Sequence, residues 1–320
     1  MGERQKKSSV LPRLSSVFFV FIFIPVLLFA SDAQFPRVEI PQKKLFVGEK
    51  LIYKISYLKI PVGEAESEVK EITEIAGRKA YHIIVRARSF PALNFIYKVQ
   101  DEHHSYIDVE GLYSLRYEKD LNEGPFHAKE TITYDPENHK AYYIKGPRSA
   151  RPPARGLSPR AGIPFASGSG DCKKPAAPET PGKPGASSAV NPNKPSPFEM
   201  MIPENIQDQL SCGYFFRTLA VQPESSVFIP VNAGKKNWSV EIKLHKVKRM
   251  KIKGIGEFEA LETEPLMPFR GIFVKQGKLR GWVSLDERRI PLKMKVKIPI
   301  LGHIVAELSH YEPGAGAGRT

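Results

Sequence analysis

The chain has 320 residues, of which 41% are hydrophobic and 10% aromatic. This composition supports a substantial hydrophobic core and excludes a wholly disordered protein. The formal net charge of +14 would by itself favour a polyanionic partner such as nucleic acid, anionic lipid or an acidic glycan.

The N-terminal residues decide where such a partner could be met. Four cationic residues precede an unbroken apolar run over 17–30, and small residues then lead to a cleavage position after Ala33. This tripartite pattern predicts a secretory signal peptide over 1–33. The run is short for a membrane-spanning helix, although an uncleaved anchor in the inner membrane is the alternative. Export to the periplasm or another extracytoplasmic space excludes nucleic acid as a partner.

The next stretch, 34–146, alternates apolar and polar residues with a period of two. The residues 51–57 and 81–87 are the clearest examples. Such alternation predicts half-buried antiparallel strands, each with one face in water. Turn signals at Gly63 and at Ala76-Gly77 separate the strands.

Residues 147–197 differ from the rest of the chain. They hold 12 of the 28 prolines, are rich in glycine, serine and alanine, and carry a net charge of +6. A segment with so few aliphatic residues cannot offset the entropy lost on ordering, so we expect a disordered, basic linker. About half of the excess charge of the mature chain lies in this linker, which leaves the folded part only mildly basic.

The alternation resumes over 198–312, most clearly at 238–244 and 294–298. Between Pro203 and Leu219, apolar residues recur every four positions instead, which predicts a single short helix with Pro203 in its first turn. The sequence therefore predicts an all-β fold with one short helix: a curved antiparallel sheet or barrel-like meander, interrupted by the linker and followed by a flexible tail over 313–320.

The search for catalytic chemistry finds no phosphate-binding glycine loop and no GxSxG, HExxH or CxxC motif. The nearest approach to a metal site is His103-His104, beside Asp101 and Glu102. Adjacent residues of a strand point to opposite faces, so we interpret both histidines as solvated polar residues rather than ligands. We expect no metal, no cofactor and no enzymatic activity.

Two cysteines, Cys172 and Cys212, belong to the mature chain. In an oxidising compartment they could form a disulfide, and the alternative is a loop thiol and a separate buried thiol on the helix. No activating neighbour of Cys212 is evident in the sequence, so we do not expect it to act as a nucleophile.

A polar set on the helix and on the strands near 279–291 is the candidate binding site. A tryptophan among charged residues suits the edge of a cavity, where its ring is covered and its N–H finds a partner. The alternative is a structural network of aspartates and arginines that ties the helix to the sheet. The set consists of Asp208, Tyr214, Arg217, Trp282, Asp286 and Arg289.

These residues also carry a family resemblance. Residues 202–217, IPENIQDQLSCGYFFR, and 271–311 resemble the C-terminal half of the bacterial family called domain of unknown function 3108. Residues 47–69 and 101–108 resemble its N-terminal half, and the six polar residues and Pro291 fall on its pattern. The resemblance implies an envelope protein with a signal peptide, a mainly antiparallel β-fold and no established catalytic residues. The long proline-rich stretch departs from the family pattern.

Three functions follow as hypotheses. The leading one is an exported binding or assembly module that holds an amphipathic envelope molecule, a lipid or a lipid-linked glycan, in its curved sheet. The second is an interaction scaffold whose basic linker contacts anionic lipid or a cell-wall polymer at the membrane surface. The third is a hydrolase of envelope polymers that uses Asp208 and Asp286, although the nearby arginines favour salt bridges.

Overall fold

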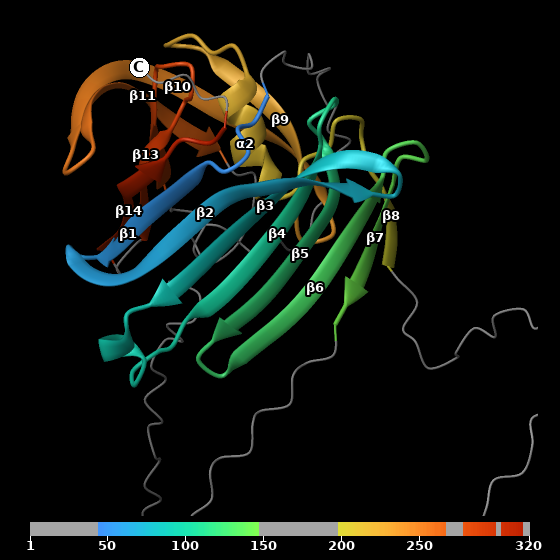
Figure 1. Ribbon diagram of the computed structural model, residues 1–320, viewed down its shortest axis with the longest axis horizontal. Helices are drawn as coiled ribbons and strands as arrows, with labels where there is room; N and C mark the ends of the chain where they lie inside the picture. The colour runs from blue at the N-terminus through green and yellow to red at the C-terminus, as the bar shows by residue number, and fades with distance from the viewer. Residues whose placement is uncertain (1–43, 147–197, 267–277, 299–301, 316–320) are drawn as a thin grey trace, which may run out of the picture. The chain divides into compact units, whose positions relative to one another are not determined.

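The computed structural model describes residues 44–146, 198–266, 278–298 and 302–315. Within them, 14 strands form one antiparallel sheet, which confirms the all-β prediction (Figure 1). The strands and helices are β1 (Lys50–Tyr57), β2 (Ile60–Ile75), β3 (Arg78–Ser89), the 3-10 helix η2 (Pro91–Leu93), β4 (Gln100–Asp108), β5 (Ser114–Glu123), β6 (Phe126–Asp135), β7 (Lys140–Lys145), β8 (Phe198–Met201), α2 (Ser211–Thr218), β9 (Ser226–Asn232), β10 (Asn237–Ile252), β11 (Gly256–Leu266), β12 (Lys278–Ser284), β13 (Pro291–Ile298) and β14 (Gly302–Glu312).

The strand order follows the sequence outward from the middle of the sheet. The chain enters at β1, proceeds strand by strand to β8 at one edge, starts again at β9 on the other edge, and ends at β14 beside β1. The strands on both sides of 147–197 therefore belong to the same curved sheet, which curls around α2 (Figure 1). The predicted linker and the signal peptide at 1–33 lie outside the described residues, as does most of the tail.

The period-two pattern accounts for most strands. On β1, Leu51, Tyr53 and Ile55 are buried while the residues between them are partly or fully exposed, and β10 repeats this pattern from Trp238 to Leu244. The middle of β3 differs from the prediction, because its expected wet face is covered there. His82 is only 7% exposed, since its ring stacks on Tyr106 with 4.5 Å between centroids.

Gly63 lies inside β2 rather than in a turn as predicted. It pairs with Ser89 of β3, and a Cβ atom at this position would lie 2.4 Å from the carbonyl oxygen of Arg88. Glycine is therefore required here for close approach of two backbones rather than for a reversal of the chain. The turn predicted at Ala76-Gly77 does separate β2 from β3.

The helix is shorter than the 203–219 segment predicted from the sequence. It spans Ser211–Thr218, and Pro203 lies outside it. The backbone before the helix is bound elsewhere: the Gln207 N–H donates to the Pro230 carbonyl at 2.8 Å, and the Gln207 carbonyl accepts from Asn232 at 2.7 Å. The apolar spacing of four thus continues through a segment that bridges to β9 and cannot form helical hydrogen bonds.

α2 occupies one end of the curved sheet, beside the start of β1 and the turn between β12 and β13. The core accordingly has two parts. The first part packs α2 against β3–β7 and β9–β11, and the second joins β1, β2, β13 and β14 to the far part of the β10–β11 hairpin. Among the described residues, no helix is both long and apolar enough to span a bilayer.

Candidate binding site on the inner face of the sheet

Arg217, at the end of α2, forms a buried ion pair with Glu49. Two of its nitrogens donate to the two carboxylate oxygens at 2.6 Å each, and the side chains are 6% and 2% exposed. The guanidinium also donates to the carbonyl of Arg288 at 3.0 Å and of Arg289 at 3.2 Å, and it lies 5.3 Å from the Tyr214 ring centroid. These contacts join α2 to the start of β1 and to the β12–β13 turn.

Asp208 belongs to a second buried group at the beginning of α2. Its carboxylate accepts hydrogen bonds from the hydroxyls of Ser105 at 2.6 Å and Ser114 at 2.8 Å. It also accepts from the backbone N–H groups of Leu210 and Ser211 at 2.7 and 2.8 Å, which start the helix. Burial raises the pKa of Asp208. The side chain fixes α2 against β4 and β5.

Of the remaining predicted residues, Arg289 reaches α2 only through its carbonyl, and Asp286 and Trp282 have their contacts elsewhere. Asp286 accepts from Ser284 at 2.6 Å and from Arg288 at 2.5 Å. Burial alone would raise its pKa, but these hydrogen bonds hold the pKa below its usual value. Arg289 has a left-handed φ of +46° and contributes its carbonyl to Arg217. Trp282 packs against the second core.

The two aspartates considered for a hydrolase therefore bind different partners, and neither partner set resembles an acid–base pair. Sequence reasoning missed Glu49, Ser105 and Ser114, and it also missed Ser67, whose hydroxyl lies 2.7 Å from the Tyr214 hydroxyl. Glu49, Ser67 and Ser105 lie within the segments 47–69 and 101–108 that carry the family resemblance, but each missed residue is far in sequence from the residue it binds. The Asp208 carboxylate and the Arg217 guanidinium are bound within the chain. The candidate site therefore lies instead on the inner face of the sheet, at the end away from α2.

An apolar row crosses four strands on this inner face. The pairing of β12, β13, β14 and β1 places Leu279 beside Val296, Val296 beside Ile304, and Ile304 beside Tyr57. The two central residues are buried, whereas Leu279 and Tyr57 are only half-buried. This part of the sheet presents apolar surface that the chain covers incompletely.

The inner face changes character on the other side of β1. In the row that follows Tyr53, the next two residues are the small Ala65 and Ala87, and the third is Asp101 of β4. One row further toward α2, Lys119 and Glu130 face each other and form an ion pair of 2.6 Å, with side chains 19% and 14% exposed. The inner face thus passes from apolar through small to charged residues across neighbouring strands.

Asp101 and Glu123 add two buried carboxyls to the charged part. They are 2% and 4% exposed. Asp101 accepts from the Asn122 N–H at 2.5 Å, while one oxygen of each carboxyl has no hydrogen-bond partner among the described residues. Burial raises the pKa of Asp101 to about 7 and, with the nearby charge of Asp101, that of Glu123 to about 8. Both are unusually basic carboxyls for their type.

The two adjacent histidines do point to opposite faces, but the prediction that both are solvated is wrong for His103. His103 is fully buried, 2.9 Å from the Tyr117 hydroxyl, because β4 turns this residue inward. His104 lies on the outer face, 2.9 Å from His82 and 2.8 Å from Glu102. Across the described ranges, no group of three or more potential ligands could hold a metal ion.

Cys212 lies in the first turn of α2 as a free, half-buried thiol that donates to the Gln209 carbonyl at 3.3 Å. Burial raises its pKa to about 12, so it is a poor nucleophile at neutral pH. The other cysteine, Cys172, lies outside the described residues, so the structure does not test the choice between a disulfide and two separate thiols.

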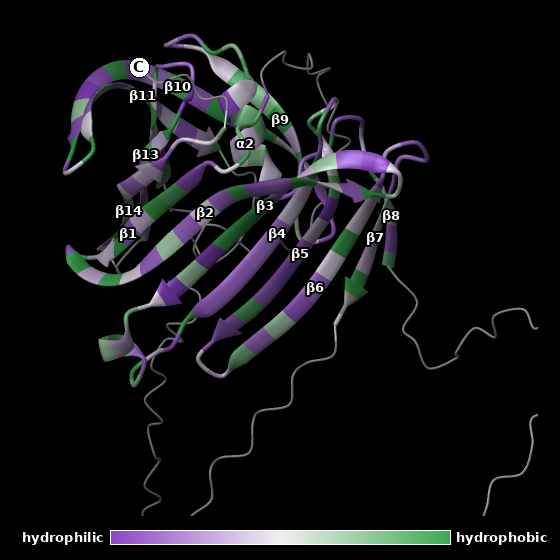
Figure 2. Ribbon diagram, in the orientation of Figure 1, coloured by the Kyte–Doolittle hydropathy of each residue, from purple (hydrophilic) through white to green (hydrophobic). Residues whose placement is uncertain are grey.

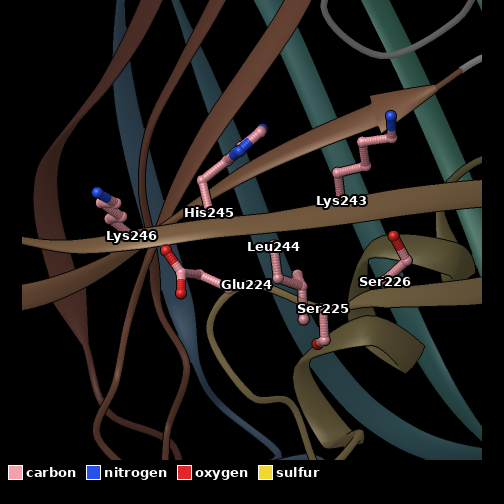
Figure 3. Close-up of a pocket in the computed structure, with 7 residues that line it drawn as sticks. All are labelled: Glu224, Ser225, Ser226, Lys243, Leu244, His245 and Lys246. Atoms are coloured by element: carbon pink, nitrogen blue, oxygen red, sulfur yellow. The ribbon is translucent and has the colours of Figure 1, made fainter.

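A shallow pocket of about 430 Å³ lies on the surface where the loop before β9 meets β10 (Figure 3). Most of its side chains are exposed, and His245 is already bound to Glu264 at 3.0 Å, so we do not place the candidate site there. The lining residues are Glu224, Ser225, Ser226, Lys243, Leu244, His245 and Lys246.

The fold and its inner face define a barrel-like antiparallel β-module with a helix closing one end. A family model described as "Protein of unknown function (DUF3108)" matches residues 52–156 and 183–309. The chain belongs to this family, which confirms the resemblance found in the sequence. No curated protein matches the chain.

Solved structures similar to the chain are distant. A β-barrel-like protein of the domain of unknown function DUF1849 from Brucella abortus is 8% identical with a TM-score of 0.47, covering 85% of this chain and 99% of its own. A Bacteroides fragilis protein described as exported, with a YmcC-like fold, is 6% identical with a TM-score of 0.32, covering 84% and 100%. A Parabacteroides distasonis protein described as a lipoprotein is 9% identical with a TM-score of 0.27, covering 85% and 100%. Such likenesses assign no function.

Proposed function

We propose that this chain is an exported, non-enzymatic envelope protein that binds an amphipathic molecule, a lipid or a lipid-linked glycan, on the inner face of its sheet. The observation that carries the proposal is the change along that face. Apolar residues on β12–β14 and β1, half-buried at Leu279 and Tyr57, give way to small residues on β2 and β3 and then to charged residues on β4–β6. A molecule with an apolar and a polar part matches this order.

The physical argument rests on incomplete burial. Apolar side chains such as Leu279 and Tyr57 would gain free energy by losing their remaining contact with water. The short side chains of Ala65 and Ala87 project little from the middle of the inner face, which leaves room for an acyl chain to lie across it. The Lys119–Glu130 pair remains accessible enough to hydrogen-bond a polar head group. α2 fills the opposite end, which leaves one end of the curved sheet for the ligand.

Native mass spectrometry of the purified chain tests this proposal. We expect a bound species that organic solvent removes. Ala87→Trp fills the middle of the inner face and should abolish the bound mass, while Arg86→Trp, on the exposed outer face of the same strand, should not. Melting curves of both variants verify that they fold. A wild-type chain that is always bare, or equal loss in the two variants, contradicts the proposal.

Export is the second part of the proposal and has its own measurement. The charged start, the apolar run over 17–30 and the small residues before Ala33 support it. The chain should be recovered from the periplasmic or another extracytoplasmic fraction of the producing cell. N-terminal sequencing of this chain should give Gln34 as its first residue. A chain that begins at Met1 in a membrane fraction supports the uncleaved anchor instead, and a soluble cytoplasmic chain contradicts export.

A further inference from the structure

Three connections at the end of the sheet opposite α2 expose apolar side chains. They are the β1–β2 turn, the β3–β4 connection with η2, and the β5–β6 hairpin, at the left and lower left of Figure 1. Figure 2 shows hydrophobic residues at the first two of them. The exposed residues, here called the apolar rim, are Leu58 (48%), Ile60 (63%), Phe95 (84%), Ile96 (64%) and Phe126 (48%).

Hydrogen bonds join the three connections into one surface. The Phe90 N–H donates to the Val62 carbonyl at 3.0 Å, which links the β3–β4 connection to the first hairpin. On the other side, the Tyr97 hydroxyl donates to the Glu123 carbonyl at 3.1 Å, and the Gly124 N–H donates to the Lys98 carbonyl at 2.7 Å. The apolar rim is therefore a continuous feature rather than three unrelated loop tips, and such patches mark interaction sites.

The charge at the apolar rim has one sign. The stretches 58–61, 90–99 and 124–127 contain no aspartate or glutamate, and they carry the exposed Lys59 and Lys98. Neither lysine makes an ion pair within the described part of the chain. Exposed aliphatic and aromatic side chains flanked by unpaired lysines complement an anionic bilayer, whose head groups attract the cations while the apolar side chains enter the interface.

We propose that the apolar rim docks on the surface of an anionic lipid bilayer. This assigns membrane contact to the folded sheet, in addition to any contact through the basic linker, and it does not depend on the proposed ligand. Docked in this way, the open end of the sheet faces the lipid and α2 faces away from it.

A fluorescent probe on the full chain tests the orientation. In a background where Cys172 and Cys212 are replaced by serine, an environment-sensitive fluorophore is attached at Phe95→Cys, or at Glu137→Cys as the control. Glu137 lies in the β6–β7 turn at the opposite end, with a side chain 79% exposed. With vesicles of phosphatidylglycerol and phosphatidylethanolamine that carry spin-labelled lipid, we expect quenching at position 95 and none at 137. An N-terminal anchor would join the folded part at the start of β1, which lies at the α2 end, so it cannot imitate quenching that is confined to position 95.

Matched substitutions separate the charge from the apolar contribution. Lys59→Glu with Lys98→Glu should raise the lipid concentration for half-maximal quenching at position 95 by about tenfold or more, whereas Lys79→Glu with Lys253→Glu, exposed elsewhere, should not. Ile60→Ser should weaken the signal, and Ile72→Ser, 48% exposed on the same strand, should leave it unchanged.

Three results overturn the proposal. Quenching that is equal at positions 95 and 137 shows that the apolar rim is not the docking surface. A probe shift at position 95 without vesicles, increasing with protein concentration, shows that a second copy covers it. Equal signals with purely zwitterionic vesicles exclude an anionic surface as the specific partner.

Discussion

At the scale of single residues, the buried Arg217–Glu49 pair is the most consequential contact around α2. Two charges removed from water are stable only when each is matched by the other, and here both carboxylate oxygens and several guanidinium nitrogens are bound. Breaking such a pair leaves an uncompensated buried charge, which costs more than the pair itself contributes.

Arg217→Met should therefore lower the free energy of unfolding by about 3–5 kcal/mol, measured by urea denaturation. The double variant with Glu49→Gln should cost less than the sum of the two single variants, because the second change removes the unpaired charge. The exposed Arg88–Glu64 pair is the control, at about 1 kcal/mol or less. If destabilised Arg217→Met still carries its bound mass in native spectrometry, the residue is structural. Lost binding in a chain of unchanged stability would contradict that role.

The buried carboxyls of Asp101 and Glu123 predict a pH dependence. Their folded pKa values of about 7 and about 8 lie above those of an unfolded chain, near 4. The native state therefore binds more protons than the unfolded state between about pH 4 and 8, and stability falls as the pH rises through this window. The double variant Asp101→Asn with Glu123→Gln should lose less free energy of unfolding over this pH window than the wild type, by on the order of 3 kcal/mol. Urea denaturation from pH 5 to 9 measures it. Parallel curves for the variant and the wild type would refute the assignment.

At the scale of elements, the strands follow from the sequence but their partners do not. Alternating apolar and polar residues predict β1 and β10 correctly, because the core covers one face of each strand and water the other. α2 is predicted too long because the Gln207 backbone bonds to β9 and the Asp208 carboxylate accepts from serine hydroxyls of β4 and β5, and neither contact is evident from the local sequence. The contacts around α2 and on the inner face could not be predicted for the same reason, because they join residues that are far apart in the sequence. Glu49 lies 168 residues from Arg217, and the inner-face rows exist only through strand register.

The segment around Gln207 closes the sheet near its free edges, and Asn232 is central to that closure. The hydroxyls of Tyr134 and Tyr143 both donate to its side-chain oxygen, at 3.2 and 2.5 Å, in a buried site. Asn232→Ala leaves two buried hydroxyls without this acceptor and should cost about 2–3 kcal/mol. Hydrogen exchange at the Gln207 amide should accelerate, and Asn138→Ala in an exposed turn should change neither quantity. Unchanged protection at Gln207 would show that Asn232 does not hold this closure.

At the scale of the whole molecule, the two blocks on either side of 147–197 contribute to one sheet. β7 pairs directly with β8, with Tyr143 opposite Phe198, so the intervening residues join strands that are already neighbours. The proline-rich composition and the basic charge of this stretch were the grounds for predicting a linker from the sequence.

Replacing 147–197 by a short glycine–serine loop should therefore leave the melting temperature within a few degrees of the wild type, because loop length changes closure entropy only slowly. If the linker contacts anionic lipid or a cell-wall polymer, the salt-sensitive part of envelope association should disappear with it. Fluorophore quenching at the apolar rim should persist, since those residues remain. Loss of folding in this variant would contradict a linker role.

The central claim is that the inner face of the curved sheet binds an amphipathic molecule. Photo-crosslinking with a diazirine-bearing fatty acid, followed by peptide mass spectrometry, tests it most directly. We predict labels on the side chains of Tyr57, Leu279 and Met294, and loss of these labels in Ala87→Trp but not in Arg86→Trp. Met294 lies two residues before Val296 on β13, between Gly281 and Ala306, and packs against the second part of the core. Labels confined to the outer face or to the apolar rim, or labels that survive Ala87→Trp, would contradict the claim.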